Sequence, residues 1–171
     1  MNYKIKLKSI RNFIFDVDGV LTDGTVMLDG SDYVRTVHSR DSYALQYACK
    51  VGFKVFLITG GTSHQVKIAY EALGVTEVHL RSSNKLEVFN SLQQKYDLDP
   101  LACLYMGDDI PDIPVMRAVG LATAPHDASL DTRLAATYVS PCCGGKGAVR
   151  DVIEQTLRVQ DRWMLEEAYY W

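Results

Sequence analysis

The sequence lacks most features of membrane, secreted and nucleic-acid-binding proteins. Its 171 residues contain no apolar run of the length that a transmembrane helix needs. The first ten residues, MNYKIKLKSI, lack the apolar centre of a signal peptide. Lysine and arginine number 18 against 21 acidic residues, so the formal net charge is −3 and a nucleic-acid module based on bulk positive charge is not expected. An anionic substrate would need a bound cation or a placed lysine.

The cysteines do not form a recognisable framework. The four of them include no CxxC pair, and the adjacent Cys142 and Cys143 are poorly placed to bridge each other. Cys49 and Cys103 fall in apolar stretches and are expected to be small core residues. The four histidines show no metal-ligand spacing with the cysteines, which argues against zinc. We therefore expect a protein of the reducing cytoplasm.

Short apolar runs alternate with amphipathic stretches, and this alternation predicts an α/β fold. Strands that alternate with helices form a parallel sheet covered on both faces. We expect a Rossmann-like three-layer sandwich, built as one domain over residues 1–171. Asp41 is expected to be the N-cap of the helix that it begins, at 41–50. The expected strands are 12–15, 53–58, 75–80, 102–106, 121–124 and 137–140, and the expected helices are 41–50, about 63–73, 84–96, 111–119, 128–135 and from about 148 onward.

Two segments stand outside this alternation. Residues 24–38 predict a β-hairpin, because β-rich stretches flank Asp29-Gly30. An isolated hairpin is only marginally stable, so it either packs on its own domain or joins subunits through its edges. Residues 144–171 are expected to form a glycine-rich tail and a helix, and the aromatic side chains near the end predict packing or a subunit contact.

Polar residues follow four of the expected strands, at the edge where open α/β sheets bind ligands. Each residue alone has an ordinary explanation as a turn former, a helix cap or a solvated side chain. Together they crowd several carboxylates at one edge, and a divalent cation would relieve the repulsion. Oxygen-only ligands favour Mg²⁺. The residues are Asp16 and Asp18, Thr59 and Gly60, Lys85, and Asp108, Asp109 and Asp112.

This set of groups suits phosphoryl transfer. Asp16 and Asp18 face the same way because they lie two apart in an extended segment. One can attack phosphorus, and the other can protonate the leaving alcohol and later deprotonate water. The Thr59 hydroxyl and the Gly60 amide can hold phosphoryl oxygens, and Lys85 can neutralise the charge that develops on them.

The four motifs together resemble the haloacid-dehalogenase superfamily. They are DVDGVLTDG at 16–24, Ile-Thr-Gly at 58–60, Lys85 and GDDIPD at 107–112. The resemblance implies that Asp16 is the nucleophile and Asp18 the acid/base. It also implies that Mg²⁺ is held by the Asp16 carboxylate, the Asp18 carbonyl and Asp108. Asp109 and Asp112 would either contact the metal through water or orient Lys85.

Members of this superfamily usually cover the site with an inserted cap domain, for which this chain has no room. The hairpin and one helix fill the interval from Asp18 to Thr59, and one helix and one strand fill the interval from Thr59 to Lys85. The catalytic edge would then be open to water, which disfavours phosphoryl transfer. We therefore expect another subunit to close it.

The capless order of motifs, with a late Gly-Gly-Lys-Gly at 144–147, is similar to the 3-deoxy-D-manno-octulosonate (KDO) 8-phosphate phosphatase family over about residues 10–153. That resemblance implies a magnesium-dependent homotetramer, joined through its hairpins, with no nucleic-acid or membrane partner. Its activity would be the hydrolysis of KDO 8-phosphate to KDO and phosphate through an aspartyl-phosphate intermediate, in lipopolysaccharide biosynthesis.

One departure concerns the substrate. Many family members carry a charged, substrate-contacting residue directly after Thr-Gly, where this chain has Gly61. The sugar phosphate could instead be a nine-carbon ulosonate 9-phosphate, such as that of KDN or sialic acid. A third hypothesis is a non-catalytic or receiver domain of the same fold, against which Asp18 and Asp112 argue. Besides Thr59, Gly60 and Lys85, the candidate substrate contacts are Arg35, Arg40, His64 and Lys67, and in the tail Lys146 and Arg150.

Overall fold

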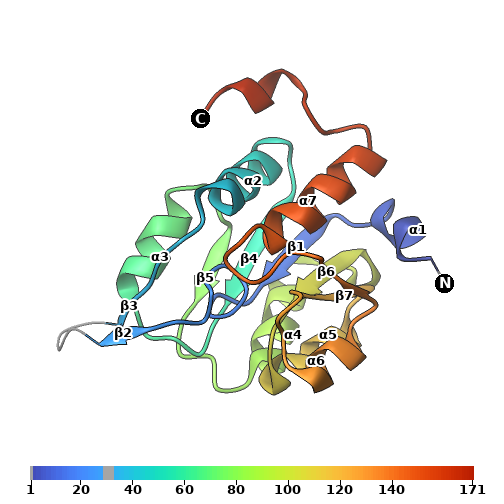
Figure 1. The fold of residues 1–171 in the computed structure, drawn as a ribbon. Helices are drawn as coiled ribbons and strands as arrows, with labels where there is room; N and C mark the ends of the chain where they lie inside the picture. The colour runs from blue at the N-terminus through green and yellow to red at the C-terminus, as the bar shows by residue number, and fades with distance from the viewer. Residues whose placement is uncertain (1, 29–32) are drawn as a thin grey trace.

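The computed structural model describes residues 2–28 and 33–171 and shows a parallel sheet between two layers of helices (Figure 1). The six strands lie in the order β5-β4-β1-β6-β7-β8, and each neighbouring pair is parallel. This confirms the three-layer α/β fold predicted from the alternation of patterns. The strands are β1 (Asn12–Phe15), β4 (Lys54–Ile58), β5 (Glu77–His79), β6 (Cys103–Met106), β7 (Leu121–Ala124) and β8 (Tyr138–Val139).

The helices divide between the two faces of the sheet (Figure 1). One layer contains α1 (Tyr3–Leu7), α2 (Ser39–Lys50), α3 (His64–Glu71) and α7 (Ala148–Val159). The other contains α4 (Lys85–Tyr96), α5 (Ile113–Ala118) and α6 (Leu130–Ala135). Three 3₁₀ turns complete the structure: η1 (Pro100–Ala102), η2 (Ile110–Asp112) and η3 (Glu166–Tyr169).

Strand β1 lies in the middle of the sheet and has no exposed face. Phe13 and Phe15 pack into the core under α2 and α7, whereas Ile14 packs into the core under α4 and α5. A parallel strand that is buried on both sides reads as a continuous apolar run, as this one does.

The order of the strands creates a topological switch at β1. The chain builds β1, β4 and β5 in one direction and then returns to β6 on the other side of β1. In such sheets the ligand crevice opens beyond the carboxyl ends of the strands beside the switch. The predicted phosphoryl-transfer residues follow β1, β4 and β6, so the topology brings them together.

The small sheet between β1 and α2 projects from the body of the molecule (Figure 1). Strand β2 (Met27–Leu28) pairs antiparallel with β3 (Tyr33–Val34), and the side chains of both are exposed. The predicted turn at Asp29-Gly30 lies outside the described residues. Between β1 and α2 the described part of the chain holds no helix or strand other than β2 and β3, in agreement with the predicted absence of a cap.

One local prediction was wrong, and one helix was not predicted. Helix α2 begins at Ser39 with His38 as its N-cap, so Asp41 lies inside the first turn. The buried Asp41 carboxylate instead accepts the backbone N–H groups of Gly147 and Arg150, at 3.0 and 2.7 Å. It therefore caps α7, because tertiary packing brings the start of that helix against it. Residues 3–7, for which no helix was predicted, form α1 with Asn2 as a side-chain cap.

The aromatic end of the chain folds back over α2. Trp171 stacks on Tyr43, and Trp163 meets the ring of Tyr47 edge-on. The Tyr47 hydroxyl donates to the Arg162 carbonyl at 2.8 Å. Of the two predicted roles for these aromatic residues, packing within the chain is the one seen for the two tryptophans.

No helix among residues 2–28 and 33–171 has the length and apolarity to cross a membrane.

Candidate active site

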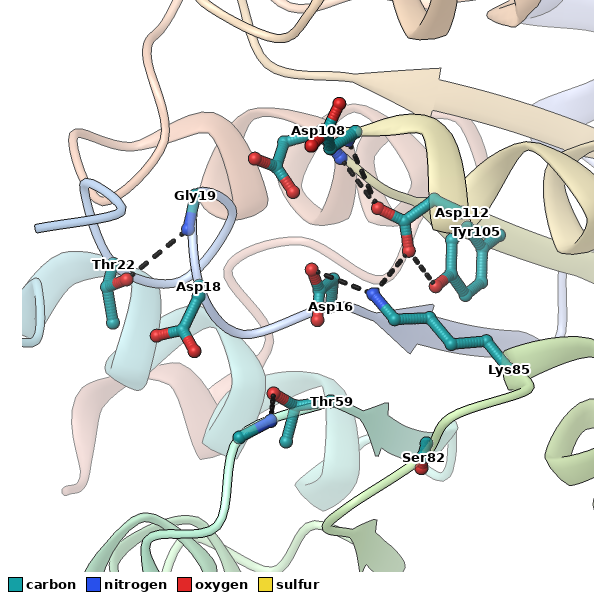
Figure 2. Close-up of polar contacts among 12 residues, drawn as sticks. Asp16, Asp18, Gly19, Thr22, Thr59, Ser82, Lys85, Tyr105, Asp108 and Asp112 are labelled. Atoms are coloured by element: carbon teal, nitrogen blue, oxygen red, sulfur yellow. Dashed lines mark hydrogen bonds and ion pairs between the residues drawn. The ribbon is translucent and has the colours of Figure 1, made fainter. Parts of the chain in front are cut away.

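Three charged side chains form a buried chain of contacts at the carboxyl end of β1 (Figure 2). Lys85, the first residue of α4, donates to Asp16 Oδ2 at 2.9 Å and to Asp112 Oδ1 at 2.6 Å. All three side chains are less than one-tenth exposed. Because the lysine bridges two carboxylates, it holds Asp16 in a fixed orientation at the mouth of the site.

Asp112 is the most heavily bonded of these groups. Besides Lys85, it accepts the Tyr105 hydroxyl at 2.6 Å and the backbone N–H groups of Asp108 and Asp109, at 3.0 and 3.2 Å. A methyl group on Gly107 would lie 2.3 Å from the Asp112 side chain, so only glycine fits there. Of the two predicted roles for Asp112, these contacts favour orienting Lys85. Its carboxylate has four donors already and is poorly placed to serve as a primary metal ligand.

Asp108 reaches the same place from the end of β6. A methyl group on Gly19 would lie 2.1 Å from Asp108 Oδ2, and the φ of Gly19 is +81°. Both facts require glycine at that position of the first motif. Asp108 thus lies directly against the loop that carries Asp16 and Asp18.

Burial and mutual repulsion raise the pKa values of two carboxyl groups in the site, Asp16 and Asp108. Burial raises the pKa of Asp16 well above its usual range, and Asp112 raises it further, whereas Lys85 opposes the shift. Burial and Asp112 likewise raise the pKa of Asp108 to about 6. Burial alone would lower the pKa of Lys85, but Asp16 and Asp112 raise it overall, so the ammonium stays charged.

The residues present fit a hard divalent cation. Carboxylate oxygens of Asp16, Asp108 and Asp112 lie within 4.8 Å of one another. Asp16 Oδ1 is buried and has no hydrogen-bond partner among the described residues. A buried carboxylate oxygen without a donor is costly unless it meets a cation. The oxygen-only donor set suits Mg²⁺, in which Asp16 and Asp108 can supply carboxylates.

Thr59 comes from the end of β4 and faces Asp16 across the site (Figure 2). Its hydroxyl accepts the Gly61 N–H at 2.9 Å, which shapes a tight turn after the strand. The loop after β5 braces this turn, since Ser82 N donates to Thr59 O at 3.0 Å and Arg81 N to Gly61 O at 2.9 Å. Arg81 adopts a φ of +56°, a conformation that costs energy for a side-chain-bearing residue. The sequence pattern gave no signal for this brace.

Asp18 lies beside Thr59 but has a different kind of partner. Arg35, just after β3, donates from Nε to Asp18 Oδ1 at 2.5 Å and from Nη2 to Asp18 Oδ2 at 3.0 Å. A methyl group on Gly61 would lie 3.2 Å from Thr59 Oγ1 and 3.3 Å from Asp18 Oδ2. The structure therefore places Arg35, one of the predicted substrate contacts, at the catalytic edge.

The other predicted substrate contacts lie on α2, on α3, and in and just before α7. His64 is the exposed first residue of α3, and Lys67 pairs with Glu71 on the same helix at 3.6 Å. Lys146 is exposed, with its Nζ 3.8 Å from Asp23. Arg150 bonds Glu154 at 3.2 Å, and its guanidinium lies over the rings of Tyr43 and Trp163. Arg40 is exposed in the first turn of α2.

The late glycines support the first motif, a role that sequence reasoning missed. A methyl group on Gly144 would lie 1.9 Å from the Gly19 carbonyl oxygen, and one on Gly145 would lie 2.6 Å from Asp23 N. Gly144 also donates to the Asp127 carboxylate at 2.9 Å. The Gly-Gly spacing could have suggested a close backbone approach, but the sequence does not reveal which backbone approaches.

Comparison with known proteins identifies relatives over nearly the full chain. No protein-family model matches. The curated KDO 8-phosphate phosphatase of Escherichia coli K12 is 37% identical over 164 residues, which cover 95% of this chain and 86% of the relative. The solved phosphatase of that name from Yersinia pestis has a TM-score of 0.90 at 32% identity, and covers 93% of this chain and 86% of its own.

A further relative carries ligands. The KDO 8-phosphate phosphatase from Moraxella catarrhalis, solved with magnesium, phosphate and KDO, has a TM-score of 0.90 at 30% identity over 94% of this chain and 92% of its own. The fold, the order of motifs and the level of identity agree with one another. The chain therefore belongs to the KDO 8-phosphate phosphatase family of the haloacid-dehalogenase superfamily.

Proposed function

We propose that this protein is a magnesium-dependent phosphomonoesterase that hydrolyses KDO 8-phosphate to KDO and phosphate, the activity named for its relatives. The observation that carries the proposal is the meeting of Asp16, Lys85 and Asp108 at the end of β1, with Asp16 Oδ1 buried and unpartnered among the described residues. A receiver or other non-catalytic domain would not need the acid/base Asp18 beside this cluster, nor the Asp112 carboxylate that orients Lys85.

In the first step, the Asp16 carboxylate attacks phosphorus and the bond to the sugar oxygen breaks. Lys85 keeps Asp16 aimed at the site and neutralises charge on the phosphoryl oxygens. The Thr59 hydroxyl and the Gly60 amide hold those oxygens from the opposite side. Asp18 gives its proton to the sugar oxygen as the alcohol leaves.

In the second step, the aspartyl-phosphate on Asp16 is hydrolysed. Asp18, now ionised, takes a proton from water, and the water oxygen attacks phosphorus to release phosphate and restore Asp16. The same residue thus serves as acid and then as base, as the two half-reactions require.

Mg²⁺ would be held by Asp16, the Asp18 carbonyl and Asp108, where it offsets the charge of the carboxylates and of the phosphoryl group. The proposal agrees with the raised pKa values of Asp16 and Asp108, because a cation returns both groups to the ionised form. Asp112 serves the reaction through Lys85 and the backbone of the metal-bearing loop.

The surface and the composition support proposals about assembly, substrate contacts and location. The exposed apolar strands β2 and β3 are suited to joining subunits. We infer that the homotetramer implied by the family resemblance is assembled through them, which would close the open edge. His64, Lys67, Lys146 and Arg150 are proposed to contact the sugar acid, whereas Arg35 is engaged by Asp18 and the Tyr33 carbonyl. The four cysteines are free thiols, which fits a cytoplasmic place in lipopolysaccharide biosynthesis.

A panel of sugar phosphates, assayed for phosphate release with Mg²⁺ and with EDTA, tests the proposal. We expect the highest kcat/KM with KDO 8-phosphate and loss of turnover in EDTA. A nine-carbon ulosonate 9-phosphate in the panel decides between the two substrates, since a site built for one polyol loses binding energy on the other. Undiminished hydrolysis in EDTA would contradict the proposed chemistry.

A further inference from the structure

Arg35 turns inward from an exposed segment. It follows β3, whose two residues are exposed, yet the Arg35 side chain is only 7% exposed. Its guanidinium meets both oxygens of Asp18 and also donates from Nη1 to the Tyr33 carbonyl at 2.7 Å. A bidentate pair of this kind fixes the plane and position of a carboxylate. Arg35 therefore connects the backbone of the small sheet to Asp18.

The glycine after Thr-Gly makes room for this contact. A methyl group on Gly61 would lie 3.1 Å from Arg35 Nη2 and 3.3 Å from Asp18 Oδ2. The φ of Gly61 lies outside the left-handed region, so its backbone would accept an alanine. A side chain at position 61 would therefore crowd Arg35 and Asp18 without straining the backbone. Gly61 and Arg35 thus act as a pair.

We propose that Arg35 is a positioning residue for the acid/base Asp18, and that Gly61 permits it to reach that carboxylate. The inference rests on the proposed function, because it assumes that Asp18 protonates the leaving oxygen. To act as the acid, Asp18 carries a proton on one oxygen in place of one guanidinium contact, and the remaining contact keeps the side chain oriented. The Asp18 side chain is 30% exposed and lies outside the buried Asp16–Lys85–Asp112 chain. Without the guanidinium it can turn away, and a displacement of about 1 Å in a reacting group can cost about 10²-fold in rate.

Leaving groups of different acidity test this role. A sugar or other alkyl oxygen must be protonated as it departs, whereas p-nitrophenolate departs without a proton. The quantity to compare is kcat/KM, because it reports the steps through cleavage of the ester and is unaffected by the later hydrolysis of the aspartyl-phosphate. For Arg35→Gln we expect kcat/KM to fall about 30- to 100-fold on KDO 8-phosphate and less than about 3-fold on p-nitrophenyl phosphate.

Three further variants make the result specific. Arg35→Lys keeps the charge but loses the bidentate contact, so an intermediate loss is expected on the sugar phosphate alone. Gly61→Ala crowds the contact but leaves residue 35 an arginine. It should lower kcat/KM on the sugar phosphate by about 10-fold, again with little loss on the aryl phosphate. Arg11→Gln, at the amino end of β1 on the opposite edge of the sheet, is the matched control and should behave as the unaltered protein.

The outcomes separate the two claims. Equal losses on both esters in Arg35→Gln and Gly61→Ala, or a further loss when Arg35→Gln is added to Asp18→Asn, would overturn the positioning role. Turnover by Asp16→Asn would instead contradict the proposed function. Equal stabilisation of Arg35→Gln and the unaltered protein by Mg²⁺ checks that the variant keeps its fold and metal site.

Discussion

The two halves of the site are held in place by different means. The nucleophile half consists of Asp16, Lys85 and Asp112, which are buried and anchored to β1, α4 and the turn after β6. The leaving-group half consists of Asp18, which is partly exposed and is held by Arg35 from beyond β3. The core of the subunit thus fixes the group that attacks phosphorus. The group that handles the proton depends on a projecting segment.

This difference suggests a division of labour. Buried networks of hydrogen bonds and ion pairs give the rigid geometry that attack on phosphorus requires. A contact that comes from the small sheet can respond to whatever that sheet touches, such as a second subunit. If so, changes in the first half should abolish chemistry on every substrate, whereas changes in the second should depend on the leaving group or on assembly.

The largest effect is expected at the centre of the nucleophile half. Asp16→Asn should lower kcat by at least about 10⁴-fold on sugar and aryl phosphates alike, because no carboxylate remains to take the phosphoryl group. Phosphate release at saturating substrate measures it. Asp97→Asn, at an exposed left-handed C-cap that asparagine also suits, is the matched control and should keep full activity. A selective loss on sugar phosphates alone would break the comparison.

A smaller but still large effect is expected from Lys85→Met. It should lower kcat about 10²- to 10³-fold on both kinds of ester, because a charge-stabilising donor is lost. It should also destabilise the fold by about 3–5 kcal/mol, because Asp16 and Asp112 are left buried without their shared cation. Urea unfolding and phosphate release measure the two effects. Tyr105→Phe, which removes one donor from Asp112, should produce the milder version of both.

For the nucleophile half, the sequence was sufficient to predict which residues lie at neighbouring strand ends. The apolar run at 12–15 and the carboxylates after it place Asp16 at a strand end, and the alternation of elements places Lys85 and Asp108 near it. The motif left the role of Asp112 open, because its four donors come from three places in the chain. Only the folded arrangement shows that they converge.

Contacts between distant segments were what sequence reasoning could not supply. Asp41 has the composition and position of a helix cap, and local patterning cannot reveal that the helix it caps begins 107 residues later, at Ala148. Arg35 was one of several cations near the site, and its inward turn depends on the space left at Gly61. The same holds for Gly144, whose neighbour is the Gly19 carbonyl.

The metal site that Asp108 shares with Asp16 of the nucleophile half should also respond to pH. The raised pKa of Asp108, about 6 against an ordinary 3.8, means that without metal the carboxyl favours folding when it is protonated. That contribution is present below about pH 4 and is lost as the pH rises through about 6. Mg²⁺ binds the ionised form, so the increase in Tm on adding Mg²⁺ should be small at pH 5 and grow towards pH 7.5.

The expected size of this increase is about 5–10 °C when Mg²⁺ is at a hundred times its Kd at the higher pH. Thermal unfolding followed at each pH, with EDTA and with Mg²⁺, measures it. Asp108→Asn should show little increase at any pH, because it removes a charged ligand. A Mg²⁺ effect that shrank between pH 5 and 7.5 would contradict the assignment of the cation to these carboxylates.

The smallest effect on the subunit itself is expected in the small sheet, where the comparison is sharpest. Leu28 is 73% exposed, so Leu28→Glu should change the free energy of unfolding by no more than about 0.5 kcal/mol. The same change should lower the mass of the protein in solution, because a charge on an exposed apolar strand opposes its burial between subunits. Urea unfolding at low protein concentration and sedimentation measure the two quantities separately.

Leu101→Glu is the control, since Leu101 is 72% exposed on η1, which precedes β6 at the edge opposite the site. It should leave the solution mass unchanged. If Arg35 transmits the position of the small sheet to Asp18, Leu28→Glu should also lower kcat/KM on KDO 8-phosphate more than on p-nitrophenyl phosphate. A monomeric, fully active unaltered protein would show that the leaving-group half needs no neighbour, and the two halves would then differ in burial alone.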